Sequence, residues 1–198
     1  MKTIVRFSAC IALALFFGVC GAQTQDPTTT YYPLAVGNSW KYEVHEGKKK
    51  SFVAWRVTKR TQSKNGAVFQ VWPTPMESDD DALTVIVNKD RIRELASGIL
   101  LVGNDLKIGE HWEMSVEGRV VRRLRVVTTG GACNGTGYAS QDCITIADTD
   151  ERLHLLTLTC YAKGIGPVWF KYYDSRKSAA SQPDSTVEII SYRVKTDD

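Results

Sequence analysis

The chain has 198 residues, and its 25 lysines and arginines nearly balance its 22 aspartates and glutamates. This length fits one domain with a core of ordinary size. The near-balance of charge gives no general electrostatic attraction to nucleic acid, so we expect no nucleic-acid partner.

The first 22 residues have the features of a signal peptide. Lys2 and Arg6 form a basic start, residues 11–19 an apolar core, and Gly21 and Ala22 supply the small residues that a signal peptidase accepts. The apolar core is shorter than the roughly 20 residues of a membrane-spanning helix. We therefore expect an exported protein, located in the periplasm, the cell envelope or the medium, with a signal peptide at 1–22, a polar linker at 23–30 and one domain at 31–198.

Cys20 supports a competing interpretation of the same segment. A cysteine after an apolar run can be the acylated first residue of a bacterial lipoprotein, although that site usually follows a small residue and Val19 precedes Cys20 here. A lipid at Cys20 would hold the domain at a membrane surface through a flexible tether.

From residue 31 onward, nearly every apolar segment alternates with period two and is rich in Val, Ile, Thr, Tyr and Trp. This pattern is typical of half-buried strands. Turn signals such as Asn65-Gly66 and Gly130-Gly131 separate the segments. We predict a single antiparallel all-β domain, whose strongly twisted sheet curls into a half-barrel or a two-layer sandwich. The expected strands cover residues 40–44, 53–57, 68–72, 83–88, 111–116, 119–128, 143–147, 153–161, 167–173 and 186–194.

One segment of the chain resembles another. PLAVGNSWKYEVHEG at 33–47 matches DLKIGEHWEMSVEG at 105–118, which aligns Gly37 with Gly109 and Trp40 with Trp112. Each copy places a turn glycine three residues before a tryptophan that opens a strand, so we expect two equivalent strand-entry corners. Both tryptophans are expected to fill the core, and a ligand box of two indoles is the alternative.

The opening YYPLAVGNSWKYEV resembles a family of exported bacterial proteins and lipoproteins that begin with YYPL, two residues, GNSW and Tyr. The same family tends to close with a Tyr and Gly-x-Gly before an apolar strand, and YAKGIGPVWF at 161–170 is similar. This resemblance implies a secreted or envelope-attached all-β domain of unassigned function, and it carries no catalytic residues.

Three cysteines follow the leader: Cys133, Cys143 and Cys160. An exported protein favours a disulfide among them, and the odd number leaves one free thiol. Alternation places Cys160 with Leu156 and Leu158 on the apolar face of its strand. In the strand at 143–147 the apolar face carries Ile144 and Ile146, so Cys143 lies on the other face. If the two strands share one core, Cys143 and Cys160 point apart, so we predict a Cys133–Cys143 bond.

The remaining residues do not form a recognised catalytic or metal-binding motif. His45, His111 and His154 have no second ligand at tight spacing, and the acidic run from Glu77 to Asp81 lacks the order of a calcium loop. We expect no cofactor, and we expect Asp148 to Glu151 to form a solvated hairpin tip.

The segment GRVVRRLRVV contains the best candidate for binding a charged partner. Simple alternation places Arg119, Arg123 and Arg125 on one face, while Arg122 breaks the pattern. Three guanidinium groups so spaced could meet phosphate or an acidic polymer, and the alternative is an exposed face whose arginines pair with neighbouring acids.

These observations favour an exported binding or structural module of the bacterial cell envelope, with envelope lipid, an anionic polymer or a surface protein as the candidate partner. A half-barrel version would carry a lipid or acyl chain in a groove lined by Trp55, Leu156, Phe170 and Tyr172. A hydrolase acting on envelope or extracellular polymer is the rival, and it needs His111 or His154 beside paired acids in a cleft. The ligand, the strand order and the oligomeric state stay open.

Overall fold

The computed structural model describes residues 30–75, 82–177 and 182–195, and within them all regular structure is β-strand. Alternating apolar and polar residues separated by turns produce this result, as the sequence predicted. The strands are β1 (Ser39–Glu46), β2 (Lys49–Ser63), β3 (Gly66–Thr74), β4 (Leu83–Asn88), β5 (Arg91–Glu94), β6 (Leu100–Gly103), β7 (His111–Val116), β8 (Arg119–Gly135), β9 (Tyr138–Asp150), β10 (Leu155–Ala162), β11 (Gly166–Asp174) and β12 (Ser185–Arg193).

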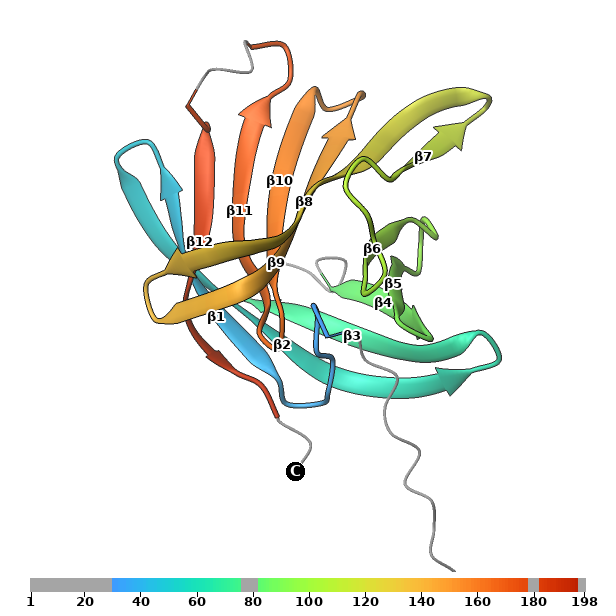
Figure 1. The fold of residues 1–198 in the computed structure, drawn as a ribbon, viewed down its shortest axis with the longest axis horizontal. Helices are drawn as coiled ribbons and strands as arrows, with labels where there is room; N and C mark the ends of the chain where they lie inside the picture. The colour runs from blue at the N-terminus through green and yellow to red at the C-terminus, as the bar shows by residue number, and fades with distance from the viewer. Residues whose placement is uncertain (1–29, 76–81, 178–181, 196–198) are drawn as a thin grey trace, which may run out of the picture.

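All of these strands belong to one antiparallel sheet in the order β6-β5-β4-β3-β2-β1-β12-β11-β10-β9-β8-β7. Strands that are consecutive in the chain pair with each other, except β6 with β7, and β1 also pairs with β12, so the sheet curls into a nearly closed barrel (Figure 1). The two edges, β6 and β7, are consecutive in the chain and are not paired with each other. The opening of the barrel therefore lies between β6 and β7.

Side chains bridge this opening at two points. The Trp112 Nε1 group on β7 donates a hydrogen bond to the Leu100 carbonyl oxygen on β6 at 2.7 Å. The Arg122 guanidinium on β8 contacts Glu94 on β5, with 3.2 Å between Nη1 and Oε2. Side-chain contacts thus hold the two edges where the backbone ladder is missing.

The two similar sequence segments form the same structure at the entry to each half of the sheet. Gly37 N–H donates to the Val57 carbonyl at 2.9 Å, and Val57 N–H donates to Asn38 at 2.9 Å. Gly109 N–H donates to the Val126 carbonyl, and Val126 N–H donates to Glu110, each at 2.9 Å. Both glycines have positive φ, 97° and 84°. The predicted equivalence of the two corners is correct.

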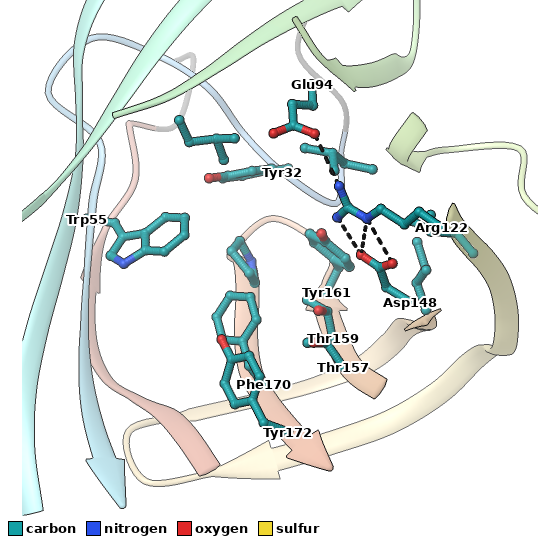
Figure 2. A pocket seen from close by; sticks show the side chains of 15 residues that line it. Tyr32, Trp55, Glu94, Arg122, Asp148, Thr157, Thr159, Tyr161, Phe170 and Tyr172 are labelled. Carbon is teal, nitrogen blue, oxygen red and sulfur yellow. Dashed lines mark hydrogen bonds and ion pairs between the residues drawn. The ribbon is translucent and has the colours of Figure 1, made fainter. Parts of the chain in front are cut away.

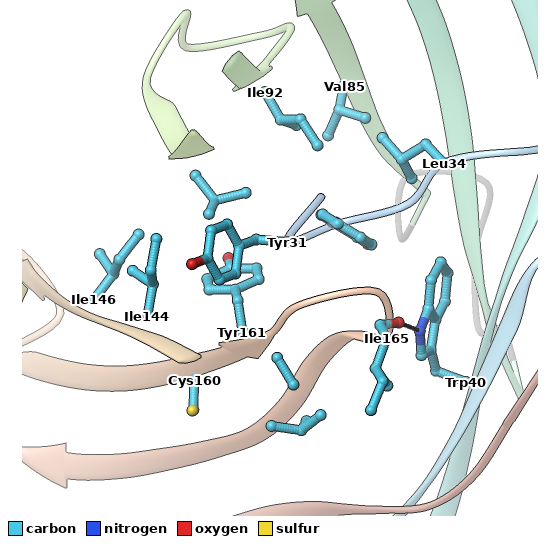
Figure 3. Packing of buried hydrophobic residues seen from close by; sticks show 14 of the residues in the cluster. Tyr31, Leu34, Trp40, Val85, Ile92, Ile144, Ile146, Cys160, Tyr161 and Ile165 are labelled. Atoms are coloured by element: carbon cyan, nitrogen blue, oxygen red, sulfur yellow. Dashed lines mark hydrogen bonds between the residues drawn. The ribbon is translucent and has the colours of Figure 1, made fainter. Parts of the chain in front are cut away.

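The segment before β1 enters the barrel and forms part of its core. Tyr32 is 2% exposed and Leu34 is fully buried. Figure 3 shows Leu34 near Val85 and Ile92 on one side, and Tyr31 beside Tyr161 on the other. The Trp40 Nε1 group donates to the Ile165 carbonyl at 2.5 Å, so the buried indole is satisfied as well as packed.

The hairpin of β8 and β9 is longer than the sequence predicted. Gly130-Gly131, expected to be a turn, lies within β8, where the pairing with β9 slips by one residue at several points. The strands continue to a turn near Gly137, and the hairpin crosses the outer face of the sheet over β12 (Figure 1). A Cβ at Gly137 would lie 3.1 Å from the Ile190 carbonyl oxygen, which shows how closely the tip approaches β12.

The strands β5 and β6, of four residues each, were not among the strands expected from the sequence. The pairs Val85–Glu94 and Arg91–Gly103 attach them to the end of the sheet. Among the described residues, no helix has the length and apolar character required to cross a membrane.

Candidate functional site

A cavity of about 240 Å³ lies inside the barrel. Strands from both halves of the chain line it, and Figure 2 shows aromatic side chains on one side and an ionic cluster on the other. Its lining residues are Tyr32, Trp55, Leu83, Glu94, Leu101, Arg122, Leu124, Ile146, Asp148, Thr157, Thr159, Tyr161, Pro167, Phe170 and Tyr172.

Stacked aromatic rings form the apolar wall. The ring centroids of Trp55 and Phe170 lie 6.1 Å apart, and those of Phe170 and Tyr172 lie 6.5 Å apart, with nearly parallel planes in the second pair. Tyr42 packs edge-on against Phe170 at 5.7 Å from deeper in the core. Such contacts fix the rings, so the wall is preformed.

The polar end consists of one arginine between two carboxylates. Arg122 Nε donates to both Asp148 carboxylate oxygens at 2.9 and 3.0 Å, and Nη2 donates to Oδ2 at 2.5 Å. Nη1 contacts Glu94 Oε2 at 3.2 Å, and the Ser97 hydroxyl donates to the same oxygen at 2.6 Å. The Asp148 hydrogen bonds are the largest cause that raises the pKa of Arg122, so this guanidinium is charged.

Arg122 faces inward because it alternates with Leu124 and Val126, and a bulge just before it changes the facing of the preceding residues. Ser115 lies opposite Val120 and Met114 lies opposite Arg122, so Val121 is one extra residue in β8. Beyond it Arg122, Leu124 and Val126 share the inner face, and Arg122 lies opposite Asp150 on β9. Sequence reasoning missed Arg122 as a site residue, although its break in the alternation was the available signal.

Asp148 was predicted to lie in a solvated hairpin tip, and this prediction is wrong. It lies opposite Thr157 on β10, two residues before the end of β9, so its side chain points into the barrel. Asp150 does form the turn: its Oδ1 accepts hydrogen bonds from the Arg152 and Leu153 N–H groups at 2.9 and 3.1 Å.

Two further hollows adjoin the cavity. The first, of about 390 Å³, shares Trp55, Phe170 and Tyr172 with it and is otherwise lined by Val53, Pro73, Pro75 and Val187. The second shares Arg122, Asp148 and Thr157 and adds Asp150, Leu153 and Leu155. The concave surface thus changes from apolar at one end to acidic at the other.

The predicted groove is correct for three of its four residues. Trp55, Phe170 and Tyr172 line the cavity, whereas Leu156 does not. Thr157 pairs with Tyr172 and Thr159 with Phe170, so the threonines of β10 share the inner face with these rings. Leu156 lies on the opposite face.

The prediction that Arg119, Arg123 and Arg125 share one face is wrong, because the bulge at Val121 shifts the phase of β8. Arg119 lies opposite Val116, on the side of Arg122, whereas Arg123 and Arg125 lie opposite Glu113 and His111. Arg123 forms ion pairs with Glu113 at 2.8 Å and Glu151 at 3.3 Å. Anion binding by these arginines stays a prediction.

Cys133 and Cys143 are joined by a disulfide, the pairing that the sequence favoured, and Cys160 is free and buried. The predicted facing of Cys160 and Cys143 was nevertheless wrong. Cys160 lies opposite Thr145 and Ala162 opposite Cys143, so Cys160 and Cys143 face the same way. Figure 3 shows Cys160 pointing away from Ile144 and Ile146.

The sulfur atoms of Cys133, Cys143 and Cys160 lie within 4.8 Å of one another, and burial raises the pKa of the Cys160 thiol to about 11.

None of the three histidines lines the cavity. His111 faces outward opposite Arg125, His154 lies in the exposed turn after β9, and His45 contacts Glu43 at 3.5 Å. The cavity also excludes Trp40 and Trp112, whose indoles serve the core and the β6–β7 opening. Cys20, the leader and the acidic run at 77–81 lie outside the described residues.

No family model and no curated protein matches the sequence. Among solved structures, a "putative exported protein with YmcC-like fold" from Bacteroides fragilis NCTC 9343 aligns with 83% of this chain and 99% of its own, at 11% identity and a TM-score of 0.51. A "putative lipoprotein" from Parabacteroides distasonis ATCC 8503 aligns with 85% of this chain and 100% of its own, at 10% identity and a TM-score of 0.49. At such identities the first likeness establishes a shared fold.

Proposed function

We propose that this chain is an exported binding module of the bacterial cell envelope that holds the apolar part of an amphipathic ligand, a lipid or acyl chain, inside its barrel. The observation that carries the proposal is the preformed aromatic wall of Trp55, Phe170 and Tyr172, which lines both the cavity and the adjoining hollow of about 390 Å³. A wall that served only the core would be closed over by other side chains.

The size and composition of the hollows support a ligand larger than water. Volumes of about 240 and 390 Å³ exceed the roughly 30 Å³ of one water molecule. The smaller lies just below, and the larger within, the range of about 300–1,000 Å³ that is typical of ligand sites. The apolar lining with a few fixed polar groups is the usual composition of such sites. Export is supported by the leader and agrees with the name of the exported fold neighbour from Bacteroides fragilis.

The test is lipid binding by the exported protein, with a variant that fills the cavity. Native mass spectrometry should detect bound lipid, and a fluorescent acyl probe should bind the purified protein. Thr157→Trp adds an indole within the cavity and should weaken probe binding by about tenfold or more. Thr58→Trp adds the same group at an exposed position of β2 and is the control. Absence of both bound lipid and probe binding would contradict the proposal.

A further inference from the structure

The ionic cluster inside the barrel is unbalanced. Glu94 and Asp148 supply two carboxylates and Arg122 one guanidinium, so the formal charge of the cluster is −1. The other described residues that line this cavity are apolar, hydroxyl-bearing or aromatic and add no positive charge. The side chains are partly shielded, with 24% of Arg122, 27% of Glu94 and 18% of Asp148 exposed. Charge acts more strongly there than in bulk water.

The hydrogen bonds show which group of the cluster is available to a ligand. Arg122 directs Nε, Nη1 and Nη2 at carboxylate oxygens, so an anionic head would compete with partners already in place. Both hydrogen bonds of Glu94 use Oε2, and Oε1 accepts none from the described residues. The cluster therefore offers an acceptor oxygen with negative charge.

We infer that the amphipathic ligand carries a protonated amine, which binds at Glu94 while its apolar part lies against Trp55 and Phe170. This inference rests on the proposed function. Figure 2 shows Glu94 and Arg122 across the cavity from Trp55, so a ligand that spans it reaches both ends. An ammonium gives three hydrogen-bond donors and restores neutrality, whereas a carboxylate or phosphate adds like charge beside Glu94 and Asp148.

The test compares three probes with the same chain, namely dodecylammonium, dodecanol and dodecanoate, by calorimetry below their aggregation concentrations. The unmodified protein should bind the ammonium about tenfold or more tightly than the carboxylate, with the alcohol between them. Glu94→Gln keeps the side-chain shape and removes the excess charge, so it should reduce that preference about tenfold. Glu113→Gln alters a glutamate that is also paired with an arginine but lies on the outer face, and it should leave the preference unchanged.

The outcomes separate this inference from the function on which it rests. Equal affinity for all three probes, or tighter binding of the carboxylate, overturns the amine and leaves the lipid-binding function standing. Failure of every probe to bind overturns the proposed function and the amine with it. The comparison on the unmodified protein decides between these outcomes even if Glu94→Gln fails to fold.

Discussion

Gly166 lies beside the indole of Trp40 at the start of β11. Its φ is 111°, and a Cβ at this position would lie 2.9 Å from Trp40 Nε1, the atom that donates to Ile165. Gly164 in the same turn has φ 75°, and a Cβ there would meet no atom within 4 Å. We predict that Gly166→Ala destabilises the protein by about 3 kcal/mol or more, and Gly164→Ala by about 1 kcal/mol. Urea unfolding of both variants measures this, and equal losses would contradict the role of the Trp40 contact.

Single residues also show what the sequence could and could not predict. Trp40 and Trp112 were assigned structural roles from the repeated glycine-tryptophan pattern, because a short motif is enough to predict a turn formed by neighbouring residues. The facing of Arg119 depends on one extra residue in β8 relative to β7. Alternation cannot register such a residue without the partner strand, since a single bulge reverses the facing of every residue on one side of it.

At the scale of elements, the opening between β6 and β7 depends on side chains. Trp112→Phe removes the N–H group that bonds Leu100 and leaves that carbonyl without this donor. We predict a loss of about 1–2 kcal/mol in the free energy of unfolding. Hydrogen exchange should accelerate in β5 and β6 more than in β1 and β12, because the latter strands are paired on both sides and lie far from the opening in the strand order.

Trp72→Phe is the matched control for this prediction. The Trp72 indole N–H is buried and has no hydrogen-bond partner among the described residues. The same substitution therefore replaces an indole by a phenyl ring without removing a hydrogen bond. It should cost less than Trp112→Phe. If the two variants are equally unstable, or if exchange rises uniformly across the sheet, the opening is held by something other than this hydrogen bond.

The error in the facing of β10 has a cause at the same scale. The β8–β9 hairpin covers part of the outer face of the sheet, so the last four residues of β10 are buried on both faces. Leu156, Leu158 and Cys160 therefore gave the appearance of an inner face, while Thr157, Thr159 and Tyr161 occupy it. Alternation identifies the core side of a strand only where the other side meets water.

For the whole molecule, the all-β class and the curled antiparallel sheet were predictable, because they depend on period and turn signals distributed along the chain. The strand order was not, since the pairing of β1 with β12 joins segments near opposite ends of the domain. The cavity was predicted in part: its aromatic residues followed from alternation in β2 and β11. Its ionic end contains Arg122, a charged residue at an apolar position of β8, and Glu94 on the undetected strand β5.

Several tyrosines are buried, and burial favours their neutral form. Burial raises the pKa of Tyr31 and of Tyr138 to about 12 each. It also raises the pKa of four tyrosines nearer the centre: Tyr32, Tyr42, Tyr161 and Tyr172. An unfolded tyrosine titrates near pH 10. The stability that comes from keeping these phenols neutral is therefore complete below about pH 10 and is lost as the pH rises toward the folded values.

We predict that the free energy of unfolding falls steeply above about pH 10, by roughly 1.4 kcal/mol per pH unit for each fully buried tyrosine. Urea unfolding at a series of alkaline pH values measures the fall, and tyrosinate absorbance recorded in the same samples identifies its source. Tyr161→Phe removes one such group from the cavity wall and should make the slope shallower. Full tyrosinate absorbance near pH 10 in the folded protein, with no loss of stability, would show that these phenols are open to solvent.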